Sequence, residues 1–175
     1  MKFFAIALTA SLLPISAHAE SAVDPVNRIM KVAEARWATT DGDAPDYFDG
    51  LDRDFSKDFA VVYREASKYP AYDGGDSPFD YDVITSSQDG CPLKDIKVSP
   101  EGEKDGVNTV AVSFRLMACA PDAESQAVVS ELKFDVVTEG GKRVISDVHR
   151  FQEGKWNTLL GEMKEGIEYA KKNQP

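Results

Sequence analysis

Apolar and polar residues alternate along three stretches in the second half of the chain. Around Phe114, around Phe134 and again over residues 143–151, every second side chain is apolar and its neighbours are mostly polar or small. Alternation with a period of two is typical of β-strands that have one covered face. A Gly140-Gly141 turn separates the last two stretches. The pattern therefore predicts three consecutive antiparallel strands within residues 107–151.

Apolar residues recur at three- and four-residue steps before and after these strands, a spacing typical of one face of an α-helix. This spacing predicts a helix that begins at Asp24-Pro25, where Asp can cap the first free amides and Pro suits the first helical position. It predicts a second helix over residues 45–69, with Gly50 as the place for a kink, and a C-terminal helix over residues 156–172.

Less regular segments lie between the second predicted helix and the three predicted strands. Residues 71–92 show no period, Ile96 and Val98 predict a short strand, and residues 100–106 predict a charged turn. Together the elements predict an α+β fold with an antiparallel, curved sheet of about four strands, packed on one face against N-terminal helices and a C-terminal helix.

The first 19 residues carry a different pattern. Lys2 gives a short positive start, an apolar run follows over residues 3–13, and Ala17-His18-Ala19 closes the stretch. This order is typical of a secretory signal peptide, and the apolar run is too short to span a membrane. We predict cleavage after Ala19, export to a bacterial periplasm, and a mature chain of residues 20–175 that forms a single domain.

The chain is acidic, with 30 Asp and Glu residues against 20 Lys and Arg and a net charge of −10. Loss of Lys2 with the signal peptide lowers the net charge to −11. A surface of this sign repels nucleic acid and anionic lipid, so we predict neither nucleic-acid binding nor membrane insertion. It suits a basic protein partner, and acidic residues of the predicted second helix offer a docking face: Asp46, Asp49, Asp52, Asp54 and Asp58.

The chain contains two cysteines, Cys91 and Cys119. An even pair in an exported protein is typical of a disulfide, and the chain has no Cys-x-x-Cys redox motif. Closing this loop would stabilise the fold by roughly 3–4 kcal/mol in the chain-entropy model. A metal site would need more ligands than the single histidine outside the signal peptide supplies, so we predict no metal and no cofactor.

The order of two helices, an irregular segment and an antiparallel meander resembles the cystatin-like, nuclear-transport-factor-like superfamily. Two motifs are similar to those of a bacterial family of exported and lipoprotein domains of unknown function. One is an aromatic-Asp segment over residues 79–82 that runs into Gln-Asp-Gly at residues 88–90. The other is the closing strand at residues 144–148, followed by Leu159-Leu160.

The chain departs from that family in lacking a lipobox cysteine and in having an Arg where a Trp often opens the closing strand. The resemblance implies a curved sheet wrapped around a long helix, a cone with a cavity, and an exported location. It implies no activity, because this fold hosts isomerases, dehydratases, transport factors, inhibitors and structural domains alike.

Asp147 and His149 are the strongest candidates for catalysis. They are two residues apart on a predicted strand, so they point to the same face together with Ile145 and Phe151. Inside a cone they could work as a base and its orienting group. In the other arrangement both face solvent while Val144, Ser146 and Val148 face the core. We favour this second arrangement, which predicts an ordinary pKa for His149.

A second candidate site lies in the irregular segment and consists of Asp80, Tyr81, Asp82, Gln88 and Asp89. Clustered carboxylates can bind a ligand or Ca²⁺ through hard oxygens. The EF-hand spacing and its closing Glu are absent from the segment, and Asx turns account for such residues without a metal.

The leading prediction is an exported binding or protein-interaction domain for a small ligand or a basic protein, of which an inhibitor or immunity protein is one form. The alternative is a small enzyme of the isomerase or dehydratase type that uses Asp147 and His149. The chain has no Gly-x-Ser-x-Gly, phosphate-loop or His-Glu-x-x-His motif, which disfavours hydrolase, nucleotide-binding and zinc-enzyme functions.

Overall fold

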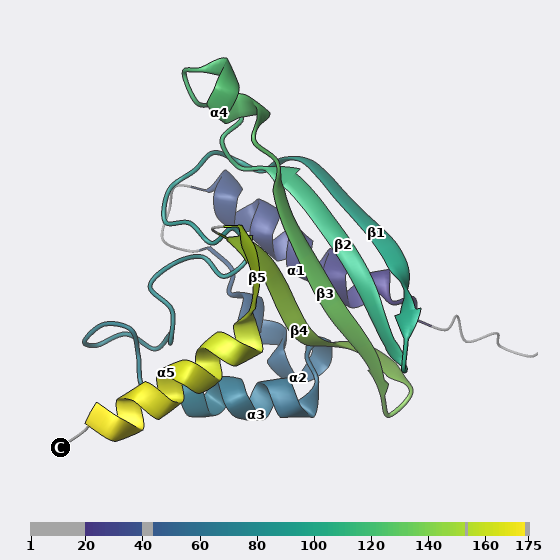
Figure 1. Cartoon of the computed structure of the whole chain (residues 1–175), viewed down its shortest axis with the longest axis vertical. Helices are drawn as coiled ribbons and strands as arrows, with labels where there is room; N and C mark the ends of the chain where they lie inside the picture. The colour runs from purple at the N-terminus through teal and green to yellow at the C-terminus, as the bar shows by residue number, and fades with distance from the viewer. Residues whose placement is uncertain (1–19, 40–43, 153, 174–175) are drawn as a thin grey trace, which may run out of the picture.

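Five antiparallel strands form one sheet, and each strand pairs with the next one along the chain (Figure 1). The computed structural model describes residues 20–39, 44–152 and 154–173, so the predicted signal peptide lies outside the described residues. The sheet confirms the predicted antiparallel meander and extends it from about four strands to five. Its strands are β1 (Lys94–Lys104), β2 (Val107–Arg115), β3 (Ser130–Glu139), β4 (Lys142–Gln152) and β5 (Lys155–Thr158).

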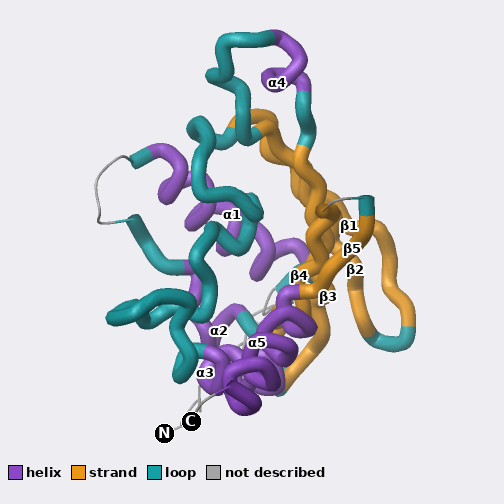
Figure 2. The backbone as a smooth tube through the Cα atoms, turned by 60° about the vertical axis from the view of Figure 1, so that its left-hand side comes forward, coloured by secondary structure: helices purple, strands orange, loops and turns teal. Residues whose placement is uncertain are grey.

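Helices cover one face of this sheet and leave the other face open. Figure 2 shows the sheet nearly edge-on, with the N-terminal helices to one side of it. Short α4 instead lies in the connection between β2 and β3, away from the other helices. The described helices are α1 (Val23–Ala38), the 3-10 turn η1 (Tyr47–Gly50), α2 (Leu51–Asp54), α3 (Lys57–Ala66), α4 (Ala123–Ala127) and α5 (Leu159–Asn173).

The core lies between the covered face of the sheet and the helices. Val110 pairs with Phe134 and Val112 with Leu132, so the alternating apolar residues of β2 and β3 stand side by side on that face. Phe114 and Phe134 are fully buried, as predicted from the alternation. Helical side chains fill the space beside them, namely Ile29, Met30, Ala33, Phe59, Met163 and Ile167.

The prediction of one continuous helix over residues 45–69 is wrong, because the segment contains η1, α2 and α3. Its apolar period is real, but the chain leaves helical geometry at Phe55 and Ser56, where Phe55 forms an isolated bridge with Ile145 of β4. The Ser56 amide donates to the Ile145 carbonyl at 2.8 Å, and the Ser56 hydroxyl accepts from the Phe59 amide and caps α3. Pairing with the sheet therefore divides the segment, whereas Gly50 marks only the junction of η1 and α2.

Further boundaries differ from the sequence prediction. α1 begins at Val23 rather than at Asp24, and the Asp24 carboxylate does not cap its free amides but accepts from the Ser21 amide at 2.6 Å. β1 runs to Lys104, and the turn is confined to Asp105 and Gly106, which both adopt positive φ. The C-terminal helix begins at Leu159, because the residues before it form β5 and pair Trp156 with Phe151. The Thr158 hydroxyl accepts from the Gly161 amide at 2.9 Å and satisfies one free amide of the first turn of α5.

A β-bulge in β4 decides which of its side chains face the helices. Asp147 stands opposite Asp135, and Ile145 stands opposite Val136, so Ser146 is an extra residue in β4. Ile145 and Val148 are consequently both buried, although simple alternation would place them on opposite faces. Before the bulge, Ile145 faces the core, as in the first arrangement considered from the sequence. After the bulge, Val148 faces the core and Asp147 and His149 do not, as in the second arrangement.

Candidate functional site

A polar hollow of about 440 Å³ lies where the irregular segment meets the end of β4 and the first turn of α5. Hydroxyl, amide and carboxylate groups surround it, and they come from three separate parts of the chain. The hollow is open to solvent on one side, and its lining is mainly polar. The lining residues are Asp80, Tyr81, Ser86, Ser87, Gln88, Gln152 and Glu162.

Asp82 fixes the shape of the segment that contributes most of this lining. Its carboxylate accepts from the Tyr47 hydroxyl at 2.7 Å and from the amides of Ile84 and Thr85 at 3.1 and 2.9 Å. The Ser86 amide donates to the Asp82 carbonyl at 2.7 Å, and Ser86 adopts a φ of +56°, a conformation that non-glycine residues rarely adopt. Burial, followed by the charge of Asp82, raises the pKa of Tyr47, so this hydroxyl stays a donor. Asp82 is therefore an organising residue rather than a ligand-contacting one.

Arg150 lies behind the wall of the hollow and contacts two of its lining residues, Tyr81 and Glu162. It is only 1% exposed and lies on the covered face of β4. One guanidinium nitrogen, Nη1, donates to the Tyr81 hydroxyl at 2.7 Å, and Nη2 forms an ion pair with Glu162. A buried charge is costly unless it is paired, and these two groups supply the pairing. Arg150 Nε has no hydrogen-bond partner within the described part of the chain.

The Tyr81 hydroxyl completes a closed set of bonds, since it accepts from Arg150 and donates to Glu162. The Arg150 guanidinium also lies over the Tyr81 ring, 5.4 Å from its centroid. Burial is the main cause that raises the pKa of Tyr81, while Arg150 opposes the rise. Each Glu162 oxygen thus has a fixed donor, and the carboxylate is held rigidly at the wall of the hollow.

Three of the five residues predicted from the irregular segment line the hollow, and two do not. Asp80, Tyr81 and Gln88 line the hollow, and the Gln88 side-chain amide donates to the Asp80 carbonyl at 2.9 Å. Asp82 points into the protein, and Asp89 is exposed and outside the lining, with its carbonyl accepting from the Ser87 hydroxyl. The sequence prediction is therefore correct in locating a polar site here but includes two residues that do not line it.

Sequence reasoning missed the partners that β4 and α5 supply. Gln152 and Glu162 follow no motif and come close to Tyr81 only through the fold. Arg150 did leave a signal, because it follows Val148 at a two-residue step on an alternating strand. A charged residue in an apolar register indicates a buried ion pair, whose partner the sequence does not identify.

Asp147 and His149 do not form the predicted pair. Asp147 Oδ1 accepts from the amides of Val148 and Leu160 at 2.8 and 3.0 Å, so this carboxylate anchors the start of α5. His149 Nε2 instead lies 2.8 Å from Asp135 Oδ2. The hydrogen bond with Asp135 is the main cause that raises the pKa of His149, against the effect of burial. This hydrogen bond argues against the expectation of an ordinary pKa for His149.

His149 and Asp135 border a second hollow of about 300 Å³ on the open face of the sheet. Trp156 and Lys133 also line it, with the Lys133 ammonium 5.4 Å from the Trp156 ring centroid. Its remaining lining residues are Glu101 and Thr109. The hollow thus combines an aromatic ring with charges of both signs.

Most acidic residues of the docking face predicted on the second helix make contacts within the protein. Asp54 is buried and forms ion pairs with Arg28 and Arg53. Asp46 accepts from the Phe48 amide and caps η1, and Asp52 forms an ion pair with Arg64. The five acids therefore do not form one free surface for a basic partner.

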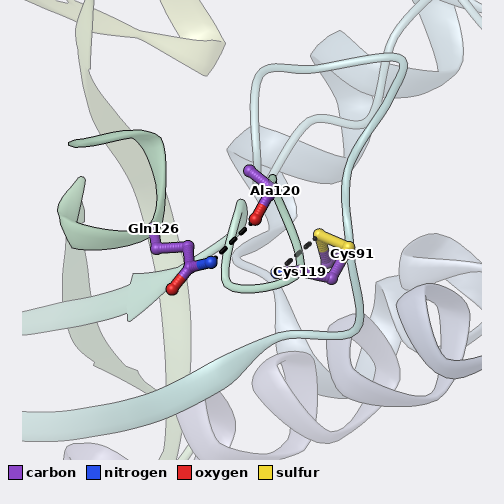
Figure 3. The surroundings of a disulfide bond; sticks show 4 residues. All are labelled: Cys91, Cys119, Ala120 and Gln126. Carbon is purple, nitrogen blue, oxygen red and sulfur yellow. Dashed lines mark hydrogen bonds between the residues drawn. A yellow bond between two sulfur atoms is a disulfide. The ribbon is translucent and has the colours of Figure 1, made fainter. Parts of the chain in front are cut away.

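Cys91 and Cys119 are joined by a disulfide, as predicted, with their Cα atoms 5.7 Å apart (Figure 3). The Cys91 amide donates to the Leu116 carbonyl at 2.9 Å, and the Cys119 amide lies 3.0 Å from Cys91 Sγ. The bond ties the end of the irregular segment to the connection between β2 and β3.

Neither a metal centre nor a membrane span is found in the described ranges. Within them, no three or more His, Cys, Asp or Glu side chains gather closely enough to hold a metal ion. No described helix combines the length and the apolar character needed to cross a bilayer.

Comparison of the chain with protein-family models, with curated proteins and with solved structures finds no match. The function must therefore be inferred from the geometry of the chain itself, and the resemblance noted from its sequence stays a prediction.

Proposed function

We propose that this protein is an exported binding protein that holds a small polar ligand in the hollow between Tyr81 and Glu162. The observation that carries the proposal is the convergence of hydrogen-bonding groups from the irregular segment, β4 and α5 around a single hollow. Their positions are fixed in advance by the buried Arg150 and by the Asx turn of Asp82. Such preorganisation lowers the entropic cost of binding, because the side chains are already ordered before the ligand arrives.

The lining indicates the kind of ligand. Asp80 and Glu162 are the charged groups among the lining residues, and the Arg150 charge lies behind the wall in an ion pair with Glu162. An anion would meet these carboxylates without a lining cation to balance them. A neutral ligand with several hydroxyl groups, or a ligand with an amine, can instead donate to the carboxylates and exchange hydrogen bonds with the serine and glutamine side chains. Export and cleavage after Ala19 belong to the same proposal, and the disulfide is compatible with them.

The enzyme alternative receives less support from the geometry. It required Asp147 and His149 to act together beside a closed pocket. Asp147 is engaged with the amides at the start of α5, and His149 contacts Asp135 beside a hollow on the open face. The proposal therefore favours binding without catalysis.

A titration with defined probes tests the proposed binding site. Glucose, N-acetylglucosamine, putrescine and arginine represent the two ligand classes, and amide chemical shifts of the mature protein report where each one binds. For a probe that binds, Asp80→Asn should weaken binding by about ten- to a hundredfold, because a hydrogen bond to a charged group contributes about 1.5–3 kcal/mol.

Asp89→Asn is the matched control, since Asp89 is an exposed carboxylate of the same segment that does not line the hollow. The proposal fails if none of the four probes shifts the amides of residues 80–88. It also fails if the Asn variants at residues 80 and 89 change the affinity equally.

A further inference from the structure

The connection between β2 and β3 extends beyond the end of the sheet. Figures 1 and 2 show it at one extreme of the molecule, with α4 at its tip and away from the helices that cover the sheet. We refer to residues 117–129 as the projecting loop. Its place is independent of the hollow between Tyr81 and Glu162.

The base of the projecting loop is locked covalently. Cys119 lies two residues after the loop begins, and its disulfide to Cys91 fixes it to the irregular segment (Figure 3). The Ala120 amide donates to the Met117 carbonyl at 3.0 Å, which closes a tight turn at the same point. A connection without such a lock would be free to move relative to the sheet.

Hydrogen bonds fix the two limbs of the loop to each other. The Gln126 side-chain amide donates to the Ala120 carbonyl at 2.7 Å (Figure 3), and Arg115 Nη1 donates to the Gln126 carbonyl at 3.2 Å. The Asp122 carboxylate accepts from the Ser125 amide at 2.8 Å and caps α4. The loop therefore presents one shape before any partner arrives, which reduces the entropic cost of docking.

Apolar side chains are exposed on this fixed loop. Val128 and Val129 are 55% and 54% exposed, and Met117 is also exposed. Val128 has extended backbone, so the two consecutive valines point to opposite sides of the loop, and both are available to a partner that encloses it. Val129 also borders a hollow of about 290 Å³ at the end of the sheet, beside Phe114 and Ile96.

The charge of the loop restricts the kind of partner. Asp122 and Glu124 are exposed, the loop contains no Lys or Arg, and neither carboxylate forms an ion pair within the described ranges. Arg115 at its base is already paired with Asp95. Two copies of the loop would repel each other, and so would two chains of net charge −10. Charge complementarity thus favours a basic partner over a second copy of this chain.

We propose that the projecting loop is a docking element that inserts Val128 and Val129 into an apolar recess with a basic rim on a partner protein. The disulfide and the α4 cap preorganise the loop, and Asp122 and Glu124 meet the basic rim.

Site-specific photo-crosslinking tests this inference with the full mature chain. A photoreactive amino acid replaces Val128, and a control chain carries it at Val61, which is 64% exposed on α3. Both chains are incubated with envelope proteins of the source organism at low and at high salt. We expect one adduct with another protein from position 128 and none from position 61. At high salt its yield should fall at least about fivefold, because screening weakens the charge contacts.

Variants then separate the apolar contribution from the charge contribution. The crosslinked protein is purified, and its affinity for the mature chain is measured. Val129→Ser and Glu124→Gln should each raise the Kd about tenfold, a change equivalent to about 1.4 kcal/mol. The matched controls Val61→Ser and Glu168→Gln alter exposed residues of α3 and α5 and should leave the Kd unchanged. Thermal unfolding of every variant checks that the fold is intact.

Several outcomes would overturn the inference. They are the absence of an adduct from position 128, an equal yield from position 61, an adduct with a second copy of the chain, and a yield that high salt leaves unchanged. A partner whose affinity responds equally to the loop variants and to the controls would overturn it as well. None of these outcomes bears on ligand binding at the hollow, which is tested separately.

Discussion

Arg150 is a charged side chain at a strand position where the alternation calls for an apolar one. It is tolerated there because Tyr81 and Glu162 supply partners for its guanidinium. The same three residues come from the irregular segment, β4 and α5. A single buried charge therefore joins three elements and places the wall of the proposed binding site.

Glu162→Gln should destabilise the protein more than an ordinary surface change does. The substitution leaves the buried Arg150 without its counter-charge, and breaking a buried pair costs about 3–5 kcal/mol. The Glu162 side chain is 40% exposed and Arg150 keeps its bond to Tyr81, so water can replace much of the interaction and we expect a smaller loss, about 1–3 kcal/mol. Urea denaturation measures it. Glu168→Gln on the exposed side of the same helix should change the free energy of unfolding by less than about 0.5 kcal/mol. Equal losses in the two variants would contradict a supporting role for Arg150.

His149 should titrate above the ordinary histidine midpoint of about 6.5 because Asp135 stabilises its protonated form. A raised pKa in the folded state adds stability that is fully present below the unfolded midpoint. This stability is lost as the pH rises through the folded pKa. NMR titration of the imidazole measures the midpoint. Asp135→Asn should lower it clearly, whereas Asp147→Asn should lower it less because Asp147 acts only through its charge. An unchanged midpoint in Asp135→Asn would show that the contact does not persist in solution.

The strands show how far a residue pattern can predict an element. Alternation located β2, β3 and β4 and selected the correct face for Phe114 and Phe134. It could not reveal the bulge at Ser146, because an extra residue in one strand is defined only by the pairing with its neighbour. The bulge changes the face of every later residue relative to the start of β4, so Asp147 and His149 do not share the face of Ile145, although the alternation within β4 puts them there. The same limit applies to the segment that ends at Phe55, where pairing with Ile145 overrides a helical period.

The disulfide fixes the base of one element, the projecting loop, to the irregular segment. Replacing both Cys91 and Cys119 by Ser should lower the free energy of unfolding by roughly 3–4 kcal/mol in the chain-entropy model. The fold should persist, because the core between the sheet and the helices does not depend on this bond. Urea denaturation with circular dichroism measures both effects, and reduced wild-type protein should match the double variant. Two free thiols in the mass spectrum of periplasmic protein would contradict the predicted oxidation state.

At the scale of the whole molecule, the sites proposed for ligand and partner occupy different regions. The hollow uses the irregular segment together with β4 and α5, whereas the projecting loop extends from the end of the sheet between β2 and β3. No residue of the projecting loop lines the hollow, so each site can be altered without removing the other. The fold class was predictable because it depends on short-range periods. The hollow was only partly predictable, because Gln152 and Glu162 are distant from Tyr81 in sequence.

The N-terminus of the folded domain yields a last prediction, which concerns export. Glu20 follows the predicted cleavage site and already belongs to the fold. Its carboxylate forms an ion pair with Arg28 at 2.8 Å and accepts from the Arg143 amide at 3.1 Å. A peptidase that cuts after Ala19 therefore leaves a chain that retains both contacts. Intact mass of the protein from the periplasm should correspond to residues 20–175.

Within that mature chain, Glu20→Ala should lower the free energy of unfolding by about 1 kcal/mol, since both contacts are only partly shielded from water. Ser21→Ala is the matched control, because the contact between Ser21 and Asp24 uses the Ser21 backbone amide, which survives the substitution. The difference between the two variants isolates the Glu20 carboxylate. A mature chain that begins after Glu20 would lose these contacts and contradict the predicted cleavage site. An equal stability of the two variants would show instead that Glu20 does not tie α1 to the start of β4.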